Sequence, residues 1–179
     1  LTIFVKNVLR AREVVARQDK LIEPDELLAR LNRELIRSNL SQCQFVTGLH
    51  AIFDQTTCRI RWARGGVPYP ILLRAGRRPE RLVSQGGLIG AFEDQAFEKV
   101  EHQFEHGDVL LFHTDGLEAL FRRRGNGDRA FNLLETEWMR RLALDGPEVA
   151  LAEARQLALS MPDTQWYKDD ITAIALSLI

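Results

Sequence analysis

The most restrictive feature of the sequence is a central series of short strand patterns that are separated by tight turns. Apolar side chains fall on both faces of residues 45–53, and Asp54-Gln55-Thr56-Thr57 makes a turn into a strand around Ile60 and Trp62. Further strands are expected over 69–74, 80–83, 97–104, 108–114 and 171–179. Short connections favour antiparallel pairing, because parallel strands need long crossovers. The sequence therefore predicts an antiparallel α+β layered domain rather than a doubly wound parallel sheet.

Helical patterns flank this series on both sides. Phe4, Val8, Ala11 and Val15 recur at helical spacing, which predicts an amphipathic helix over residues 1–17. A second helix is expected to begin at Pro24 and to end near residues 38–39. Three more helices are expected over 117–121, 128–142 and 147–159. The strands at 97–104 and 108–114 are expected to pair as a hairpin across His106-Gly107.

Composition excludes several functional classes. A chain of 179 residues predicts one domain over 1–179, at about 150 residues per domain. With 24 Lys+Arg against 25 Asp+Glu, it lacks the basic surplus of a nucleic-acid binder. Its apolar stretches are too short for a membrane-spanning helix of about 20 residues. Cys43 and Cys58 are too few for a disulfide framework, which fits a reducing, cytoplasmic setting. Because residue 1 is Leu, we expect this to be the C-terminal part of a longer protein.

Charged residues are segregated along the chain. Seven arginines share one short stretch with a single opposing glutamate: Arg59, Arg61, Arg64, Arg74, Arg77, Arg78 and Arg81. The next stretch is acidic: Glu93, Asp94, Glu98, Glu101, Glu105, Asp108, Asp115 and Glu118. One interpretation is attraction between the solvent faces of neighbouring hairpins, and the other is a basic lip beside an acidic, metal-collecting pocket. Charge by itself does not choose between them.

Two carboxylate positions flank apolar strand patterns. Asp115, in the motif His113-Thr114-Asp115-Gly116, comes just after the run at 109–112, and Asp169-Asp170 directly precedes the run at 171–175. Carboxylates held together at strand ends repel one another unless a hard divalent cation lies between them, and oxygen ligands suit Mg²⁺ or Mn²⁺. The alternative is that Asp115 caps the next helix and that Asp169-Asp170 is an ordinary turn. No serine or cysteine shows a nucleophile motif, and we interpret the glycines at 86–90 as a turn.

Taken together, these motifs make the chain resemble a known enzyme family. Four stretches carry the resemblance: Phe45 to Asp54, Trp62 to Pro70, Gly107 to Leu117, and Lys168 to Thr172. The chain resembles the bacterial PP2C-like (PPM-type) metal-dependent serine/threonine phosphatases of the sporulation-phosphatase and stress-sigma-regulator branch. The resemblance implies an α-β-β-α sandwich of two antiparallel sheets, here missing its first strands. It also implies two Mn²⁺ or Mg²⁺ ions with Asp115 and Asp169 as metal ligands, Gly116 and Asp170 in supporting positions, and no catalytic residue beyond the ligands.

The sequence departs from the family pattern in three places. The early Asp-x-x-Gly-His-Gly motif is absent from these 179 residues, Gly66-Val67-Pro68 lacks the usual histidine, and Leu88-Ile89-Gly90 is shortened. Two functions therefore stay open. One is a phosphatase that acts on a phosphorylated signalling protein such as an anti-anti-sigma factor, joined to an upstream sensor or receiver domain and considered also as a homodimer. The other is a catalytically dead pseudophosphatase that serves as an adaptor.

Overall fold

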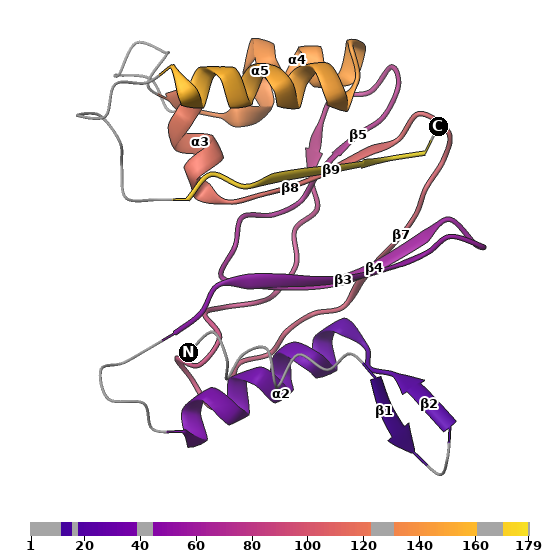
Figure 1. Cartoon of the computed structure of the whole chain (residues 1–179), viewed down its shortest axis with the longest axis vertical. Coiled ribbons are helices and arrows are strands. Elements are labelled where there is room, and N and C mark those ends of the chain that lie inside the picture. The colour runs from indigo at the N-terminus through magenta and orange to yellow at the C-terminus, as the bar shows by residue number, and fades with distance from the viewer. Residues whose placement is uncertain (1–11, 16–17, 39–44, 123–130, 161–169, 179) are drawn as a thin grey trace. The chain divides into compact units, whose positions relative to one another are not determined.

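The chain forms two compact units that each contain an antiparallel sheet and at least one helix (Figure 1). The computed structural model describes residues 12–15, 18–38, 45–122, 131–160 and 170–178. The first unit comprises residues 1–67 and 84–104, and the second comprises residues 68–83 and 105–179. This mixed α+β structure with two antiparallel sheets confirms the predicted fold class. No helix among the described residues is long and apolar enough to cross a bilayer.

The first unit is built on a three-stranded sheet. Its strands are β3 (Gly48–Asp54), β4 (Arg59–Gly65) and β7 (Val100–Gln103), in the order β3-β4-β7. Helix α2 (Pro24–Arg37) begins with proline and two acidic residues, which suit the first turn of a helix. Its buried leucines form one core with side chains of the sheet and the following loop: Leu28, Leu31, Leu35, Ala63, Ile89 and Phe97.

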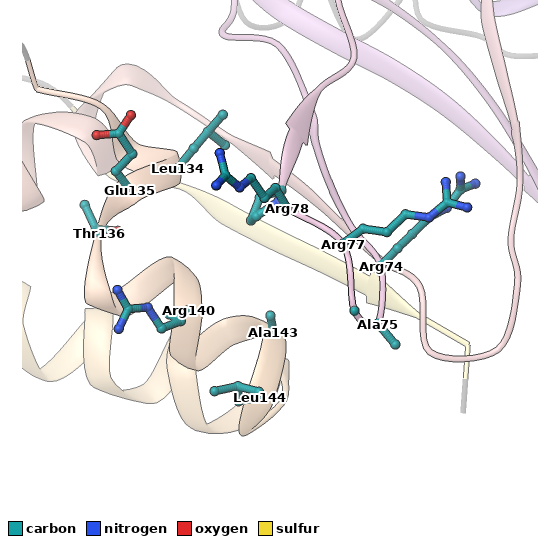
Figure 2. Close-up of a pocket in the computed structure, with 12 residues that line it drawn as sticks. Arg74, Ala75, Arg77, Arg78, Leu134, Glu135, Thr136, Arg140, Ala143 and Leu144 are labelled. Atoms are coloured by element: carbon teal, nitrogen blue, oxygen red, sulfur yellow. The ribbon is translucent and has the colours of Figure 1, made fainter.

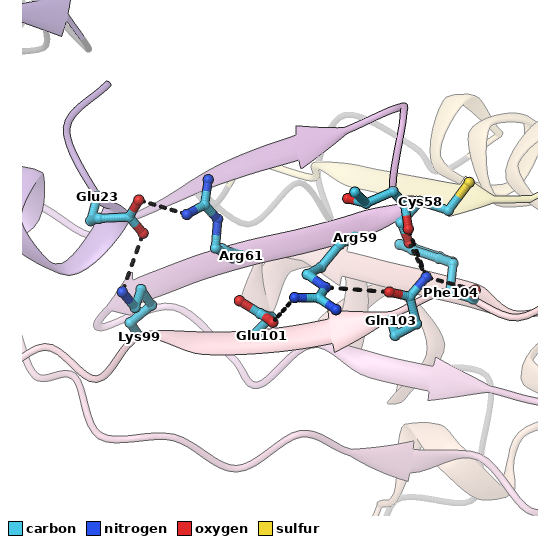
Figure 3. A network of polar contacts seen from close by, with 9 residues as sticks. Glu23, Cys58, Arg59, Arg61, Lys99, Glu101, Gln103 and Phe104 are labelled. Carbon is cyan, nitrogen blue, oxygen red and sulfur yellow. Dashed lines mark hydrogen bonds and ion pairs between the residues drawn. The ribbon is translucent and has the colours of Figure 1, made fainter. Parts of the chain in front are cut away.

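Polar side chains join the start of α2 to the edge of this sheet (Figure 3). Glu23, which precedes the helix, lies 2.6 Å from Arg61 Nη1 and 3.3 Å from Lys99 Nζ. Along the same strand pair, Arg59 Nη1 lies 2.9 Å from Glu101 Oε1 on β7. Of the basic residues of β4, Arg59 pairs with a glutamate on the neighbouring strand and Arg61 pairs with the glutamate before α2. The Arg59 pair agrees with attraction between neighbouring strands as the explanation of the segregated charges.

The glycine-rich segment at 86–90, which lies between β4 and β7 in the sequence, packs closely against β4. A Cβ atom at Gly86 would overlap the carbonyl of Arg64, so only glycine lets the two backbones approach. The Arg64 guanidinium donates to the carbonyl oxygens of Val67 at 2.7 Å and Ser84 at 3.0 Å, which ties the residue two positions after β4 to the residue that precedes the glycine-rich segment by two positions. The segment predicted as a turn instead contains two isolated antiparallel β-bridges, Gly86 with Phe97 and Ile89 with Val46, and turns only at Gly90.

The second unit contains a four-stranded sheet covered by helices (Figure 1). The strand order is β6-β5-β8-β9, with bounds Ile71–Leu73 for β5, Glu80–Arg81 for β6, Val109–His113 for β8 and Ala173–Ser177 for β9. The helical segments are α3 (Asp115–Arg122), η1 (Leu133–Glu135), α4 (Glu137–Leu144) and α5 (Pro147–Leu159). Ile71, Leu111, Leu117 and Leu142 are fully buried in the core that joins sheet and helices.

Two predictions about local structure were wrong. Within the helix expected over 1–17, residues Arg12–Val15 form strand β1, which pairs with β2 (Gln18–Leu21). The adjacent β-branched residues Val14 and Val15 favour an extended backbone, and pairing decided the outcome over helical periodicity. Residues 1–11 of that prediction lie outside the described residues. The second wrong prediction is the single helix over 128–142. Residues 128–130 lie outside the described residues, and the described part contains two separate helical segments, η1 and α4, in place of one helix.

The hairpin expected across His106-Gly107 was also wrong. Strand β7 pairs with β4, whereas β8 pairs with β5 on one edge and with β9 on the other. The physical reason is burial: β8 is buried at four of its five residues, while alternate residues of β7 are exposed. A strand that is apolar on both faces takes a central position with two partners, and an alternating strand suits the edge of another sheet.

We expect Asn32→Ala to loosen the first unit. Asn32 is 1% exposed, and its side chain accepts from Gly90 N at 2.6 Å and donates to the Phe92 carbonyl at 2.9 Å. Alanine leaves both backbone groups without this partner, which should lower the free energy of unfolding by about 1–3 kcal/mol. Urea unfolding measures the change, with the exposed neighbour Arg33→Ala as the control. Equal midpoints for Asn32→Ala and wild type would contradict this role.

Candidate metal site

The junction between β8 and α3 presents the carboxylate of Asp115. Strand β8 ends at His113 and helix α3 begins at Asp115, so one residue separates the buried strand from the helix. The Asp115 side chain is exposed, and its Oδ1 accepts from the adjacent Gly116 N–H at 3.1 Å. A capping carboxylate would bond one or two residues further into the helix. Among the described residues, Asp115 makes no such bond, so capping does not account for it.

Thr114 fastens this junction to the segment that leads into β9. Its N–H donates to the Thr172 carbonyl at 3.0 Å. Its hydroxyl donates to the Asp170 carbonyl at 2.8 Å and accepts from Thr172 N–H at 2.9 Å. These bonds extend the β8–β9 ladder, whose last pair is His113 with Ala173. Two motifs that lie far apart in the sequence are thereby held side by side.

Gly116 allows the close approach of the two segments. A Cβ atom at this position would lie 2.6 Å from the Asp170 carbonyl oxygen and 3.2 Å from Ile171 Cγ1. The first distance is shorter than real Cβ atoms show, and the neighbour is backbone that is already bonded to Thr114. The glycine of the Thr-Asp-Gly motif is therefore needed for space, while its supporting role at a metal site stays a prediction.

The remaining predicted site residues lie on the β9 side of this junction. Asp170 is exposed, and its carbonyl is the group that Thr114 holds. Asp169, predicted as the second metal ligand, lies outside the described residues, so its role stays a prediction. Within the part of the chain that the structure describes, no three His, Cys, Asp or Glu side chains gather as a metal cluster. The described donors at the junction are oxygens, which fit Mg²⁺ or Mn²⁺.

Charged and polar groups surround the start of α3. His113 is 6% exposed, and its Nδ1 lies 3.1 Å from the Thr114 carbonyl oxygen. Burial lowers the pKa of His113 and outweighs the contact with that carbonyl, which raises it. Burial thus favours the neutral form of this imidazole at the end of β8. Glu118, one turn after Asp115, lies 3.8 Å from Arg81 Nη2.

The sequence analysis missed the part played by Thr114. It treated this residue only as a member of a motif, although its side chain makes two of the three bonds that join the segments. The available signal was a hydroxyl residue at the end of one apolar strand and another, Thr172, at the start of the next. Such residues often bond to backbone where a strand ladder runs out.

Comparison with known protein families gives one match over nearly the whole chain. Residues 2–179 match the family described as stage II sporulation protein E (SpoIIE). The comparison with curated protein sequences gave no match.

Three solved structures illustrate the similarity in fold. The PP2C phosphatase domain of SpoIIE from Bacillus subtilis, solved with a fragment of its regulatory domain, is 15% identical with a TM-score of 0.67. It aligns with 99% of this chain and 48% of its own. The RsbU and RsbW domains of a Mycobacterium tuberculosis protein give 20% identity and a TM-score of 0.58, and the alignment covers 84% of this chain and 40% of that protein's chain. RsbX in complex with magnesium is 15% identical with a TM-score of 0.55, and the alignment covers 83% of this chain and 61% of RsbX. The chain thus spans less than two thirds of each of these proteins.

We expect Gly116→Ala to separate the two segments of the junction. The added methyl group cannot fit against the Asp170 carbonyl, so the Thr114 bonds should lengthen and the free energy of unfolding should fall by about 1–3 kcal/mol. Urea unfolding and the amide hydrogen exchange of Thr172 report the two effects. Gly48→Ala is the matched control, because its Cβ would meet only Ile89 Cδ1, at an ordinary 3.9 Å. Unchanged exchange at Thr172 in Gly116→Ala would show that the close approach is unimportant.

Proposed function

Because the chain belongs to the stage II sporulation protein E family of PP2C-like phosphatases, we propose that it forms the phosphatase domain of a metal-dependent protein serine/threonine phosphatase. Its substrate is a small phosphorylated signalling protein such as an anti-anti-sigma factor. The observation that carries the proposal is the Thr114 junction, which sets the exposed Asp115 carboxylate beside the segment that begins at Asp170. Asp169, the next residue back, is the second proposed ligand.

The proposed mechanism assigns a positioning role to each residue of the junction. Asp115 and Asp169 would hold Mn²⁺ or Mg²⁺, which in such sites lowers the pKa of water and neutralises charge on the phosphoryl oxygens. Thr114 fixes the separation of the two segments, and Gly116 makes that separation short. Asp115 stands at the amino-terminal end of α3, where its backbone is held by both strand and helix. No covalent intermediate on the protein is required, in keeping with the lack of a nucleophile motif.

The similar structures support the finer parts of this proposal. RsbX was solved with magnesium, and SpoIIE was solved with part of a regulatory domain. RsbU lies beside an RsbW domain in the mycobacterial protein. By analogy, we propose a divalent cation as cofactor, an upstream sensor or receiver domain in the longer protein, and a cytoplasmic location. A homodimer is retained as part of the same proposal.

A second function, that of a pseudophosphatase adaptor, is favoured by one observation. Val67 stands in Gly66-Val67-Pro68 where the family has a histidine, so the imidazole of the family pattern is missing at this position. A binding module would keep the fold and the phosphoprotein surface while hydrolysis is lost. The two functions differ in whether the longer protein turns over a phosphorylated partner.

We expect Asp115→Asn in the longer protein to reduce Mn²⁺-dependent hydrolysis of an aryl phosphate by about 100-fold or more, because it removes a charged ligand from a two-metal site. The exposed Asp115 contributes little to core packing, so the unfolding midpoint should stay within the error of wild type. Asp94→Asn, at another exposed position, is the matched control.

Two outcomes would count against the phosphatase proposal. Wild-type turnover in Asp115→Asn would show that this residue is not a ligand. Absence of hydrolysis in the wild-type longer protein at saturating Mn²⁺, together with retained binding of a phosphorylated partner, would establish the adaptor function instead.

A further inference from the structure

Two exposed arginines of the basic stretch, Arg77 and Arg78, form no ion pair with the residues that the structure describes. Most of the stretch is accounted for by ion pairs, among them Arg59 with Glu101 and Arg74 with Asp108. Arg77 and Arg78 are exposed on the turn between β5 and β6, and neither forms an ion pair with a described residue. Attraction between strands therefore does not explain these two positions, and their charge is available to a ligand.

The same turn forms one wall of a pocket in the second unit (Figure 2). The pocket has a volume of about 480 Å³, which lies within the usual range for ligand sites. The β5–β6 turn lines one side, and η1 with the middle and end of α4 lines the other. The charged members of the lining are Arg74, Arg77, Arg78, Glu135 and Arg140.

The charged groups are arranged unequally around this pocket. Figure 2 shows the Arg78 guanidinium directed toward η1, with Arg140 on the α4 side. The guanidinium groups of Arg74 and Arg77 extend away from α4, and Arg74 Nε lies 3.3 Å from Asp108 Oδ1. Arg140 pairs with Glu137 at 3.1 Å, but both side chains are 69% exposed, and such surface pairs exchange partners readily. Arg78 and Arg140 are therefore the two cations that can share one ligand.

The rest of the lining restricts the chemistry of that ligand. Leu134, Ala143 and Leu144 give the pocket an aliphatic side, and Leu144 is 77% exposed. The lining contains no aromatic side chain on which a nucleobase could stack. Glu135 adds a negative charge that opposes a dense polyanion such as a nucleotide triphosphate. A chain that alternates separate carboxylates with aliphatic side chains matches both parts of the pocket.

We propose that this pocket binds an acidic peptide segment of a protein partner, with carboxylates on Arg78 and Arg140 and an aliphatic side chain against Leu134 and Leu144. Guanidinium–carboxylate pairs supply strong, directional bonds, and the leucines supply apolar area.

The pocket is separate from the candidate metal site. Leu73, just before the turn, pairs with Val109 at the start of β8, whereas Asp115 follows the other end of that strand. The four residue steps of β8 span roughly 13 Å at about 3.3 Å per residue. The peptide-binding measurement can therefore succeed or fail separately from the proposed phosphatase activity.

Fluorescence anisotropy of labelled hexapeptides that combine Glu and Leu in different orders, titrated with the full chain, tests the proposal. At least one such peptide should bind, its Gln-for-Glu analogue should bind roughly tenfold more weakly or worse, and added salt should weaken binding. Arg78→Gln combined with Arg140→Gln should give a similar loss. Both side chains are exposed, so the variant should fold normally. Arg37→Gln, at an exposed arginine on α2, is the matched control and should bind like wild type.

Three results would overturn the proposal. The first is no saturable binding of any acidic peptide by wild type. The second is equal binding by wild type and the double variant. The third is displacement of the labelled peptide by ATP or inorganic phosphate at a concentration similar to that of the peptide. That result would identify a site for small anions.

Discussion

The hydrogen bonds of Thr114 are the constraint on which the candidate site depends. They join the end of a buried strand to a segment more than 50 residues later, and they do so with both the backbone and the side chain. Strand β8 can hold its end rigidly because it has a partner on each edge and is buried along most of its length. The approach then requires glycine at position 116, since any Cβ would collide with the Asp170 carbonyl. Fold and site are therefore determined by the same few contacts.

Much of this architecture could be predicted from the sequence, because local patterns determine it. Proline at residue 24 predicted the start of α2, and the turn at 54–57 predicted the β3–β4 hairpin. The partners of β7 and β8 could not be predicted, because strand pairing depends on which edges the rest of the chain leaves open. Likewise, Asp115 could be named from its place after an apolar strand, whereas the role of Thr114 depends on a partner segment that no local pattern reveals.

The segregated charges illustrate how one sequence feature divides into two roles. Arg59 and Arg61 pair across or beside the three-stranded sheet, and Arg74 pairs with the buried Asp108 in the second unit. These ion pairs hold neighbouring segments together, which explains the charge of the arginines that form them. The unpaired Arg77 and Arg78 lie where the β5–β6 turn meets a pocket, and their charge has no structural use among the described residues. Basic side chains that form no ion pair within the described residues therefore indicate a binding surface better than the total number of basic residues does.

The most direct test of the account is where Mn²⁺ binds on the chain. Paramagnetic Mn²⁺, added in small amounts to the ¹⁵N-labelled protein, broadens the amide signals of residues near the bound ion. If Asp115 and the segment that precedes β9 form one cation site, the signals of Gly116 and Thr172 will broaden together, and excess Mg²⁺ will restore both. Sharp signals at these two residues, with broadening confined to the acidic stretch at 93–105, would contradict a metal site at the Thr114 junction.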